Sequence, residues 1–337
     1  MLNKAKDFLR RRVRAVQRAG QYPVLLPHHA VNDAGIASVN GESRALPSTM
    51  RKALSLCDGG RSLAEVARQA GVAKADLIRA QDEGLLIVWR SPVPADVPQS
   101  QHPPHSIIVS PHLDDAALCC GGRMLGDEAV RVVNVFSRGA WWRFASTPED
   151  AERVETCRRA EEAMVSRLSG ATTTDLRLPE ALLRGHAMAD VFTATPGTRD
   201  DEVSAAISRA IATMAREHRL THWYVPLGVG DHIDHRIVRD AAAAALRTAN
   251  VPPTHLHYYE DLPYAAKLGP EADFAKRLPG QTLRAELLEI DDLIDWKLEL
   301  LRAYWSQFRW SELEELRRYA KGVGGGEASE VAWTPAA

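Results

Sequence analysis

One short segment of the chain brings a histidine and two carboxylates together at a spacing that suits a metal ion. Residues 110–116 read SPHLDDA and contain His112, Asp114 and Asp115. His112 and Asp115 stand three positions apart across a tight loop, so both side chains can turn toward one point and supply a nitrogen and an oxygen ligand. Asp114 lies between them and faces a different direction, which leaves its carboxylate available for proton transfer.

A second segment of similar character lies farther along the chain. Residues 226–235 read PLGVGDHIDH and contain His232 and His235. A catalytic zinc ion commonly takes three protein ligands and leaves a further position for water, whose pKa it lowers. The two ligands of the first segment and one of these histidines would complete such a set. The other histidine and Asp114 would then remain to take the proton of the water and to stabilise the oxyanion of an amide, so the residues predict a metal-dependent amide hydrolase.

Both segments are expected to follow strands of an α/β sheet. Short apolar stretches predict strands at residues 105–110, 130–137, 173–178, 221–226 and 255–260. Helical patterns lie between them at residues 148–168, 200–218 and 235–249. Such alternation predicts a mostly parallel sheet with helices on both faces. Ligands bind beyond the carboxyl ends of the strands in such sheets, and the two segments follow the first and the fourth strand, so we expect them to meet there.

These segments resemble the motifs of the LmbE/PIG-L family of zinc-dependent N-deacetylases. The resemblance rests on SPHLDD followed by CGG, on the glycine-rich loop before HIDH and on KLELLRAYWSQF, and it extends over residues 105–308. Leu113 stands where the family commonly has proline, and Ala116 where it has glutamate. The resemblance implies a Rossmann-like fold and removal of an N-acyl group, most often acetyl, from an amino sugar or an amino-sugar-bearing metabolite.

The resemblance also implies a role for five residues. His112, Asp115 and His235 match the zinc ligands of the family. Asp114 matches its general base, and His232 matches the histidine that stabilises the tetrahedral intermediate or acts as an acid. Zinc is therefore the expected metal, although a site of two histidines and one aspartate would also accept Fe²⁺ or Co²⁺.

Other residues are candidates for contacts with the substrate or for support of the site. The loops SRGAWWR and YYEDLPY follow predicted strands, and from them we expect Arg138, Trp141, Trp142 and Tyr264 to contact the substrate. Aromatic rings stack on sugars or hold acyl chains, and arginine binds phosphate or carboxylate. A hydrophobic lid with a solvated arginine is the structural alternative. We also expect Asp234 to orient one of the histidines through a hydrogen bond.

Composition divides the chain into four parts. Residues 1–90 predict a small helical, winged-helix-like module, residues 91–104 a proline-rich linker, residues 105–320 the deacetylase-like domain and residues 321–337 a flexible tail. The first module resembles winged-helix modules attached to natural-product tailoring enzymes. In its helix-turn-helix-like part the acids Glu65, Asp76, Asp82 and Glu83 nearly balance the local lysines and arginines, which disfavours nucleic-acid binding. Homo-oligomerisation or docking of a protein partner is the expected alternative.

Bulk properties agree with an enzyme that acts on a small molecule. The chain has 337 residues, a formal net charge of -2 and four cysteines without a disulfide pattern. No stretch approaches the ~20 apolar residues that span a bilayer, so we expect a cytoplasmic protein. Two alternatives stay open. One is an amidase that cleaves a larger conjugate, such as a thiol-sugar adduct or an acylated peptide, and the other is a docking or regulatory protein that acts through the N-terminal module.

Overall fold

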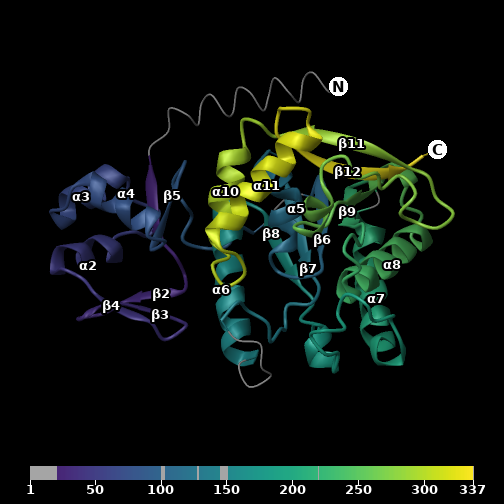
Figure 1. The fold of residues 1–337 in the computed structure, drawn as a ribbon, viewed down its shortest axis with the longest axis horizontal. Coiled ribbons are helices and arrows are strands. Elements are labelled where there is room, and N and C mark those ends of the chain that lie inside the picture. The colour runs from purple at the N-terminus through teal and green to yellow at the C-terminus, as the bar shows by residue number, and fades with distance from the viewer. Residues whose placement is uncertain (1–20, 100–102, 127–128, 145–150, 219, 337) are drawn as a thin grey trace.

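The structure, a computed structural model, describes residues 21–99, 103–126, 129–144, 151–218 and 220–336. A small N-terminal module lies beside a larger α/β domain (Figure 1). The module has its own core around Leu54, Val66 and Leu77. Other side chains of the module, Val24 and Trp89 among them, belong to the core of the larger domain. The two parts therefore share buried apolar surface.

The module combines short strands with three short helices. Its strands are β1 (Tyr22–Leu25), β2 (His29–Val31), β3 (Gly35–Ser38), β4 (Ser43–Ala45) and β5 (Leu86–Trp89), and its helices are α2 (Ser48–Ser55), α3 (Leu63–Ala70) and α4 (Lys74–Asp82). Strands β2, β3 and β4 form an antiparallel sheet, and β1 pairs with β5. Ser62 caps α3 in a reciprocal arrangement with Glu65, which explains where that helix begins.

Polar contacts fix the module on the larger domain. The side chain of Glu299 accepts hydrogen bonds from Gln81 Nε2 at 2.6 Å and from the backbone N–H of Val88 at 3.3 Å. Arg302 Nη2 donates to the carbonyl oxygen of Gln81 at 2.5 Å. The contacts join α4 and β5 to helix α10 (Ile294–Leu301) and the residue that follows it.

A seven-stranded sheet forms the centre of the larger domain. Its parallel strands are β6 (Ser106–Ser110), β7 (Val130–Asn134), β8 (Thr172–Asp175), β9 (His222–Pro226) and β10 (Leu256–Tyr259). The spatial order is β11-β12-β10-β9-β6-β7-β8. Because β6 and β9 are neighbours and run in the same direction, their carboxyl ends lie side by side. The predicted α/β fold with a mostly parallel sheet is confirmed.

Helices cover both faces of this sheet (Figure 1). The long helices are α5 (Asp115–Gly126), α6 (Ala151–Ser169), α7 (Asp201–Glu217), α8 (Ile233–Thr248) and α11 (Trp310–Val323). Helices α7 and α8 pack on each other, whereas α5, α6 and α11 all pack with α10 or with one another. No helix in the described part of the chain is long and apolar enough to cross a membrane.

The prediction of a flexible tail at residues 321–337 is wrong. Residues Ser329–Pro335 form strand β12, which pairs antiparallel with both β10 and β11 (Leu283–Glu289). Val331 and Trp333 are buried in the core of the domain. The run of glycines before this strand, which suggested flexibility, forms the turn that leads from α11 into it, with φ of 68° at Gly325.

Candidate metal centre

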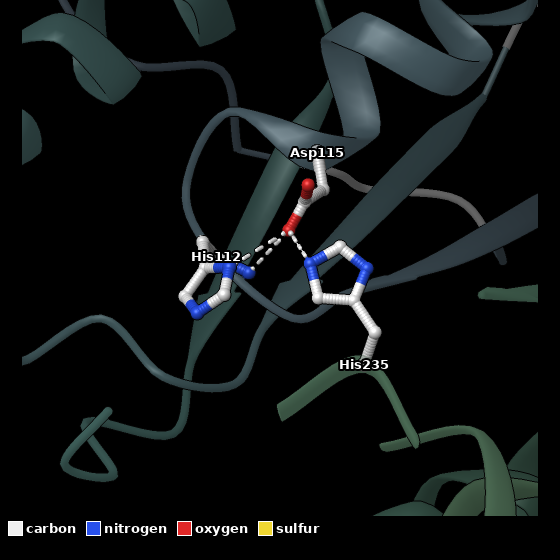
Figure 2. A group of neighbouring side chains, drawn as sticks. All are labelled: His112, Asp115 and His235. Atoms are coloured by element: carbon white, nitrogen blue, oxygen red, sulfur yellow. Dashed lines mark hydrogen bonds and ion pairs between the residues drawn. The ribbon is translucent and has the colours of Figure 1, made fainter. Parts of the chain in front are cut away.

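The two segments that carry histidines and aspartates meet beyond the carboxyl ends of β6 and β9. His112 lies in the loop after β6, Asp115 is the first residue of α5, and His235 lies in the first turn of α8. Asp115 Oδ2 lies 3.2 Å from His112 Nδ1 and 3.4 Å from His235 Nε2 (Figure 2). One donor atom from each residue lies within 4.8 Å of the other two, so the three could hold one metal ion.

The loop after β6 is shaped by local hydrogen bonds. Ser110 Oγ donates to the carbonyl oxygen of His112 at 2.5 Å and accepts from the backbone N–H of Ala116 at 2.9 Å. The backbone N–H of His112 donates to Asp115 Oδ2 at 2.8 Å. The tight turn therefore follows from a serine at the end of the strand and an aspartate at the start of the helix, and it sets the side chain of His112 beside Asp115.

The outer nitrogen of each ligand histidine is held by a further carboxylate. His112 Nε2 lies 3.1 Å from Asp234 Oδ2, and His235 Nδ1 lies 2.6 Å from Asp261 Oδ1. When each neutral ring donates through this outer nitrogen, its inner nitrogen presents a lone pair to Asp115. Buried His235 Nε2 has no hydrogen-bond partner among the described residues. With both rings neutral, two lone pairs and a carboxylate oxygen converge here, and such a set fits a bound cation.

A second group of possible ligands fits less well. His112, His232 and Asp234 also bring three donor atoms together. The carboxylate of Asp234, however, already accepts from the backbone N–H of Ala181 at 3.0 Å and pairs with Arg184 Nη2 at 2.7 Å. Its negative charge is thereby matched by a protein cation, so the first group is the better metal site.

Charges from the carboxylates dominate the electrostatics of the centre. Burial alone would lower the pKa of His112, but Asp115 and Asp234 raise it to about 10. Burial would raise the pKa of Asp115, but the neighbouring His235 and His112 bring it to about 2. The site therefore holds its carboxylates as anions and attracts positive charge.

Asp114 lies beside the centre and faces a cavity. Its Oδ1 accepts from Arg158 Nη2 at 3.3 Å, and Arg158 Nη1 lies 3.4 Å from Glu180 Oε2. Burial, followed by repulsion from Asp115, raises the pKa of Asp114, and the charge of Arg158 opposes that rise. The carboxylate thus occupies a different environment from that of Asp115.

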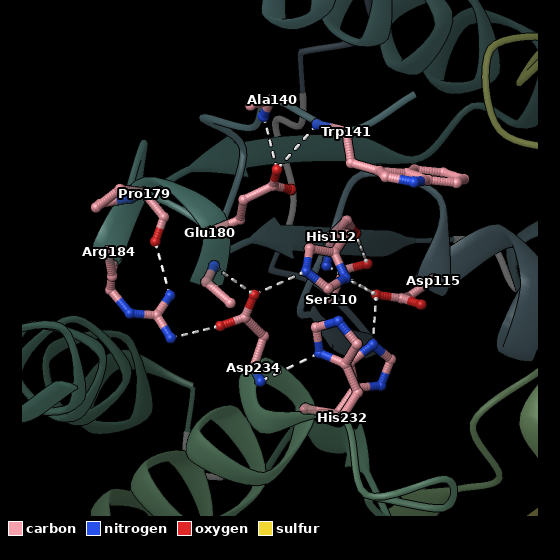
Figure 3. Close-up of polar contacts among 12 residues, drawn as sticks. Ser110, His112, Asp115, Ala140, Trp141, Pro179, Glu180, Arg184, His232 and Asp234 are labelled. Carbon is pink, nitrogen blue, oxygen red and sulfur yellow. Dashed lines mark hydrogen bonds and ion pairs between the residues drawn. The ribbon is translucent and has the colours of Figure 1, made fainter. Parts of the chain in front are cut away.

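His232 lies beside the centre, as the N-cap residue of α8. Its Nδ1 accepts from the backbone N–H of Asp234 at 3.2 Å, and its ring centroid lies 5.1 Å from that of His112 (Figure 3). Burial, and then the two neighbouring histidine rings, lower its pKa to about 3. The ring is therefore neutral near pH 7.

A cavity of about 370 Å³ opens above these residues. Asp114, Asp115, His112 and His232 line its floor. Its walls carry apolar and aromatic side chains, namely Trp141, Met188, Val191, Phe192, Tyr264 and Phe308. Charged side chains, among them Arg158, Glu180, Lys267, Glu312 and Glu315, also line it, and such a mixture of polar and apolar groups suits a polar small molecule.

A family match covers both of the segments that build the centre. Residues 107–246 match the family described as PIG-L, GlcNAc-PI de-N-acetylase. These residues form a PIG-L family domain. The expectation drawn from SPHLDD and HIDH is therefore confirmed at the level of the family.

A curated relative and solved structures share the PIG-L region. The chain is 29% identical over 255 residues to 2'-N-acetylparomamine deacetylase of Streptomyces fradiae, which covers 68% of this chain and 90% of the relative. The zinc-inhibited form of teicoplanin deacetylase Orf2 has a TM-score of 0.56 at 22% identity, over 68% of this chain and 97% of that chain. The A40926 pseudoaglycone deacetylase Dbv21 has a TM-score of 0.54 at 24% identity, over 70% of this chain and 98% of that chain. The two structures share the fold of the PIG-L domain.

Two of the four residues expected to contact substrate lie away from the PIG-L cavity. Trp142 is buried and packs with Val154 and Cys157. Arg138 is exposed and pairs through its backbone with Pro179, and its side chain does not line the cavity. Trp141 and Tyr264, by contrast, do line it. Consecutive residues in extended backbone point in opposite directions, so the pair of tryptophans in this loop cannot both face the cavity.

Several supporting residues were missed in the sequence. Arg158 belongs to CRRAEE, a segment rich in charged residues, and Arg184 to ALLRGH, and in neither segment does a pattern mark the arginine as buried. Asp261 lies in YYEDLPY, a loop from which the sequence indicates only Tyr264 as a site residue. Its position directly after a strand is the signal that could have identified it, because polar side chains at such ends face the site.

Proposed function

We propose that this chain is a metal-dependent N-deacetylase that hydrolyses the acetamide of an N-acetylated amino sugar or of a metabolite that carries one. The observation that carries the proposal is the convergence of His112 Nδ1 and His235 Nε2 on the carboxylate of Asp115 beside a cavity, where His235 Nε2 has no hydrogen-bond partner among the described residues. The family match and the deacetylase from Streptomyces fradiae agree with this class of hydrolase.

Zinc is the metal that we propose, held by His112, Asp115 and His235. Two imidazole nitrogens and one carboxylate oxygen form a ligand set common to catalytic zinc, and Fe²⁺ or Co²⁺ would also be accepted. When bound, such an ion supplies Lewis acidity that polarises the amide carbonyl and lowers the pKa of water.

Asp114 is the proposed general base. Its carboxylate lines the cavity next to the three ligands, and Arg158, which also lines the cavity, donates to it from Nη2. It takes a proton from the attacking water as the oxygen–carbon bond forms, and it returns that proton to the nitrogen as the carbon–nitrogen bond breaks. The products are acetate and the free amine, so one group serves both steps.

His232 is the proposed hydrogen-bond donor to the oxyanion. Because its Nδ1 accepts from the backbone N–H of Asp234, the proton of the neutral ring lies on Nε2. That N–H can donate to the carbonyl oxygen as negative charge develops there. We therefore propose a neutral donor here in place of the protonated acid that the resemblance allowed.

Aromatic walls support an amino sugar as the substrate. Trp141, Tyr264 and Phe308 line the cavity from different segments of the chain. Aromatic faces stack on the C–H surface of a sugar ring, while the polar floor can accept the acetamide. The cavity volume of about 370 Å³ suits one sugar ring with its N-acetyl group.

A larger conjugate as substrate is the second candidate, and it is favoured by the mouth of the cavity. Met188 and Phe192 line the cavity and remain 43% and 42% exposed. Large apolar side chains that stay exposed at the rim of a site can contact a part of the substrate that extends beyond it. The same chemistry would then release acetate from a sugar attached to a larger body.

The proposal is tested by metal content and acetate release measured on the same samples. The substrates are N-acetylglucosamine and 2'-N-acetylparomamine, and the variants are His235→Ala and Asp114→Asn. We expect about one metal ion per chain in the wild type. His235→Ala should lose metal and turnover, whereas Asp114→Asn should keep the metal and lose ~10²–10⁴-fold in rate. Wild-type protein that binds metal but releases no acetate from either compound or from larger acetylated conjugates would overturn the proposed function.

A further inference from the structure

We propose that Arg184 is a positioning residue for the metal centre. It fixes the carboxylate of Asp234, which in turn holds the ring of His112. A segment that lines the cavity therefore also supports a metal ligand. The inference rests on the proposed function only for the presence of a metal at His112, Asp115 and His235.

Asp234 is completely buried and is held from three directions (Figure 3). Its Oδ2 accepts from His112 Nε2 at 3.1 Å and from the backbone N–H of Ala181 at 3.0 Å. Its Oδ1 lies 2.7 Å from Arg184 Nη2. Both oxygens of this carboxylate therefore have partners, and one of the partners is a ligand of the proposed metal.

The guanidinium of Arg184 is held by hydrogen bonds at Nε and Nη1, and its Nη2 makes an ion pair with Asp234 without hydrogen-bond geometry. Its Nε donates to Asp200 Oδ1 at 2.9 Å, and its Nη1 donates to the carbonyl oxygen of Pro179 at 2.9 Å. Its central carbon lies 4.8 Å from the ring centroid of Phe136. Only 4% of the side chain is exposed. A guanidinium held in this way presents Nη2 to Asp234 in one orientation.

Asp200, which holds Arg184, is itself held by two neighbouring residues. Its Oδ1 also lies 3.0 Å from His186 Nε2, and its Oδ2 accepts from the backbone N–H of Gly197 at 3.0 Å. The contacts run from Asp200 through Arg184 and Asp234 to His112. Every side chain of this relay is buried or nearly so.

Charge explains why the arginine matters. A buried carboxylate without a compensating cation moves toward other donors, because desolvation of the anion is costly. A displaced Asp234 would no longer lie within hydrogen-bond distance of His112 Nε2, so the orientation of that ligand would no longer be fixed. Loss of such a partner typically weakens metal affinity ~10–100-fold.

The segment that ends with Arg184 also forms part of the wall of the cavity. Ala181 and Leu182 line the cavity and belong to the short 3-10 helix η2 (Ala181–Arg184), which ends with the arginine. The backbone N–H of Ala181 donates to Asp234 at 3.0 Å. One carboxylate thus connects a wall of the cavity with a metal ligand, and a change in this segment is expected to alter both substrate binding and metal affinity.

The test compares Arg184→Met and Arg184→Lys with Arg199→Met. Arg199 is exposed in the same segment and donates to the carbonyl oxygen of Gly185, without contact to Asp234, so it is a matched control. Zinc affinity is measured on the full chain by competition with a chelating dye, after removal of metal. The tautomer of His112 is read from the nitrogen chemical shifts of its ring, and thermal unfolding checks the fold.

We expect Arg184→Met to weaken zinc affinity ~10–100-fold and to alter the signals of His112. Arg184→Lys should restore part of the affinity, because it keeps the charge without the fork of donors. Arg199→Met should match the wild type. Wild-type affinity together with unchanged His112 signals in Arg184→Met would overturn the inference. If that variant fails to fold, Arg184→Lys and Asp200→Asn, which leave the cation in place, decide by the same readouts.

Failure of the inference differs from failure of the proposed function in this experiment. If the wild-type protein binds zinc but hydrolyses no acetylated amino sugar, the proposed function is wrong and the role of Arg184 still stands. Wild-type protein that binds no metal overturns both.

Discussion

His28 of the N-terminal module stacks on Trp305 of the larger domain, with ring centroids 4.0 Å apart and ring planes 5° apart. His28 is buried, and neither of its ring nitrogens has a hydrogen-bond partner among the described residues. Trp305 lies shortly before Gln307 and Phe308, which line the cavity. This stacked pair therefore joins the module to the segment that forms one wall of the proposed active site.

The stability of the protein is expected to depend on pH through His28. Burial, followed by the charges of His29 and Arg143, lowers its pKa to about 2, below the value of about 6.5 for an unfolded histidine. Between these values the unfolded chain binds a proton that the folded chain does not, so stability is present above pH ~6.5 and falls as the pH falls.

His28→Phe removes this dependence and keeps an aromatic ring on Trp305. The free energy of unfolding of the wild type, relative to that of this variant, should fall by about 2 kcal/mol between pH 7 and pH 5. Chemical denaturation at both pH values measures the difference. An equal change with pH in both proteins would show that the buried histidine does not titrate as we expect.

Asp261→Asn should weaken metal binding through the other histidine. Asp261 is buried, and it contacts His235 Nδ1 at 2.6 Å and accepts from the backbone N–H of Val229 at 2.8 Å. An amide can present an N–H to the ring and stabilise the wrong tautomer, so we expect ~10–100-fold lower zinc affinity. Titration against a chelating dye measures it. Asp240→Asn, at an exposed carboxylate, is the control and should bind zinc as the wild type does.

Glu330→Gln should destabilise the larger domain strongly. Glu330 Oε1 lies 2.7 Å from Lys297 Nζ, and both side chains are buried. Removal of one partner leaves a buried charge uncompensated, which costs about 3–5 kcal/mol. Asp295→Asn breaks an ion pair with Arg317 in which the carboxylate is 78% exposed, and it should cost less than about 1 kcal/mol. Denaturant unfolding of both variants measures the contrast, and similar losses in the two would contradict it.

Gly230→Ala should impair substrate binding more than stability alone explains. Gly230 has φ of 84°, and an added Cβ would lie 2.6 Å from Cγ of Tyr264, whose side chain lines the cavity. Gly170 has φ of 83° with open space around it, so Gly170→Ala reports the backbone strain by itself, about 1–2 kcal/mol. We expect both variants to lose stability and only Gly230→Ala to raise KM. Unfolding and steady-state kinetics on the two proteins distinguish strain from displacement of the tyrosine.

The sequence was sufficient to predict the parallel strands and the residues that meet beyond them. Strands such as β6 and β9 are short apolar stretches with chemistry directly after them, and all parallel strands of a sheet end on the same side. His112, Asp115 and one histidine of HIDH could be placed together for that reason, and the family resemblance selected His235. The supporting partners could not, because the pairing of Asp234 with Arg184 and of His235 with Asp261 depends on how loops fold over the sheet.

The tail was mispredicted for a related reason. Residues 327–335 follow a run of glycines, and no local pattern indicates that they insert between two strands formed earlier in the chain. Trp141 and Trp142 show the same limit at smaller scale. Their types identify an aromatic loop, but the backbone direction decides that only Trp141 faces the cavity.

The position of β12 sets an order of assembly during synthesis. It lies between β10 and β11, and its Glu330 accepts hydrogen bonds from the backbone N–H groups of Gly122 and Arg123 in α5, the helix that begins with Asp115. The three residues proposed as metal ligands are therefore synthesised long before β12, the strand that completes the sheet beside them. Until then the nascent domain has an open gap in its sheet, where a chaperone or another strand could bind.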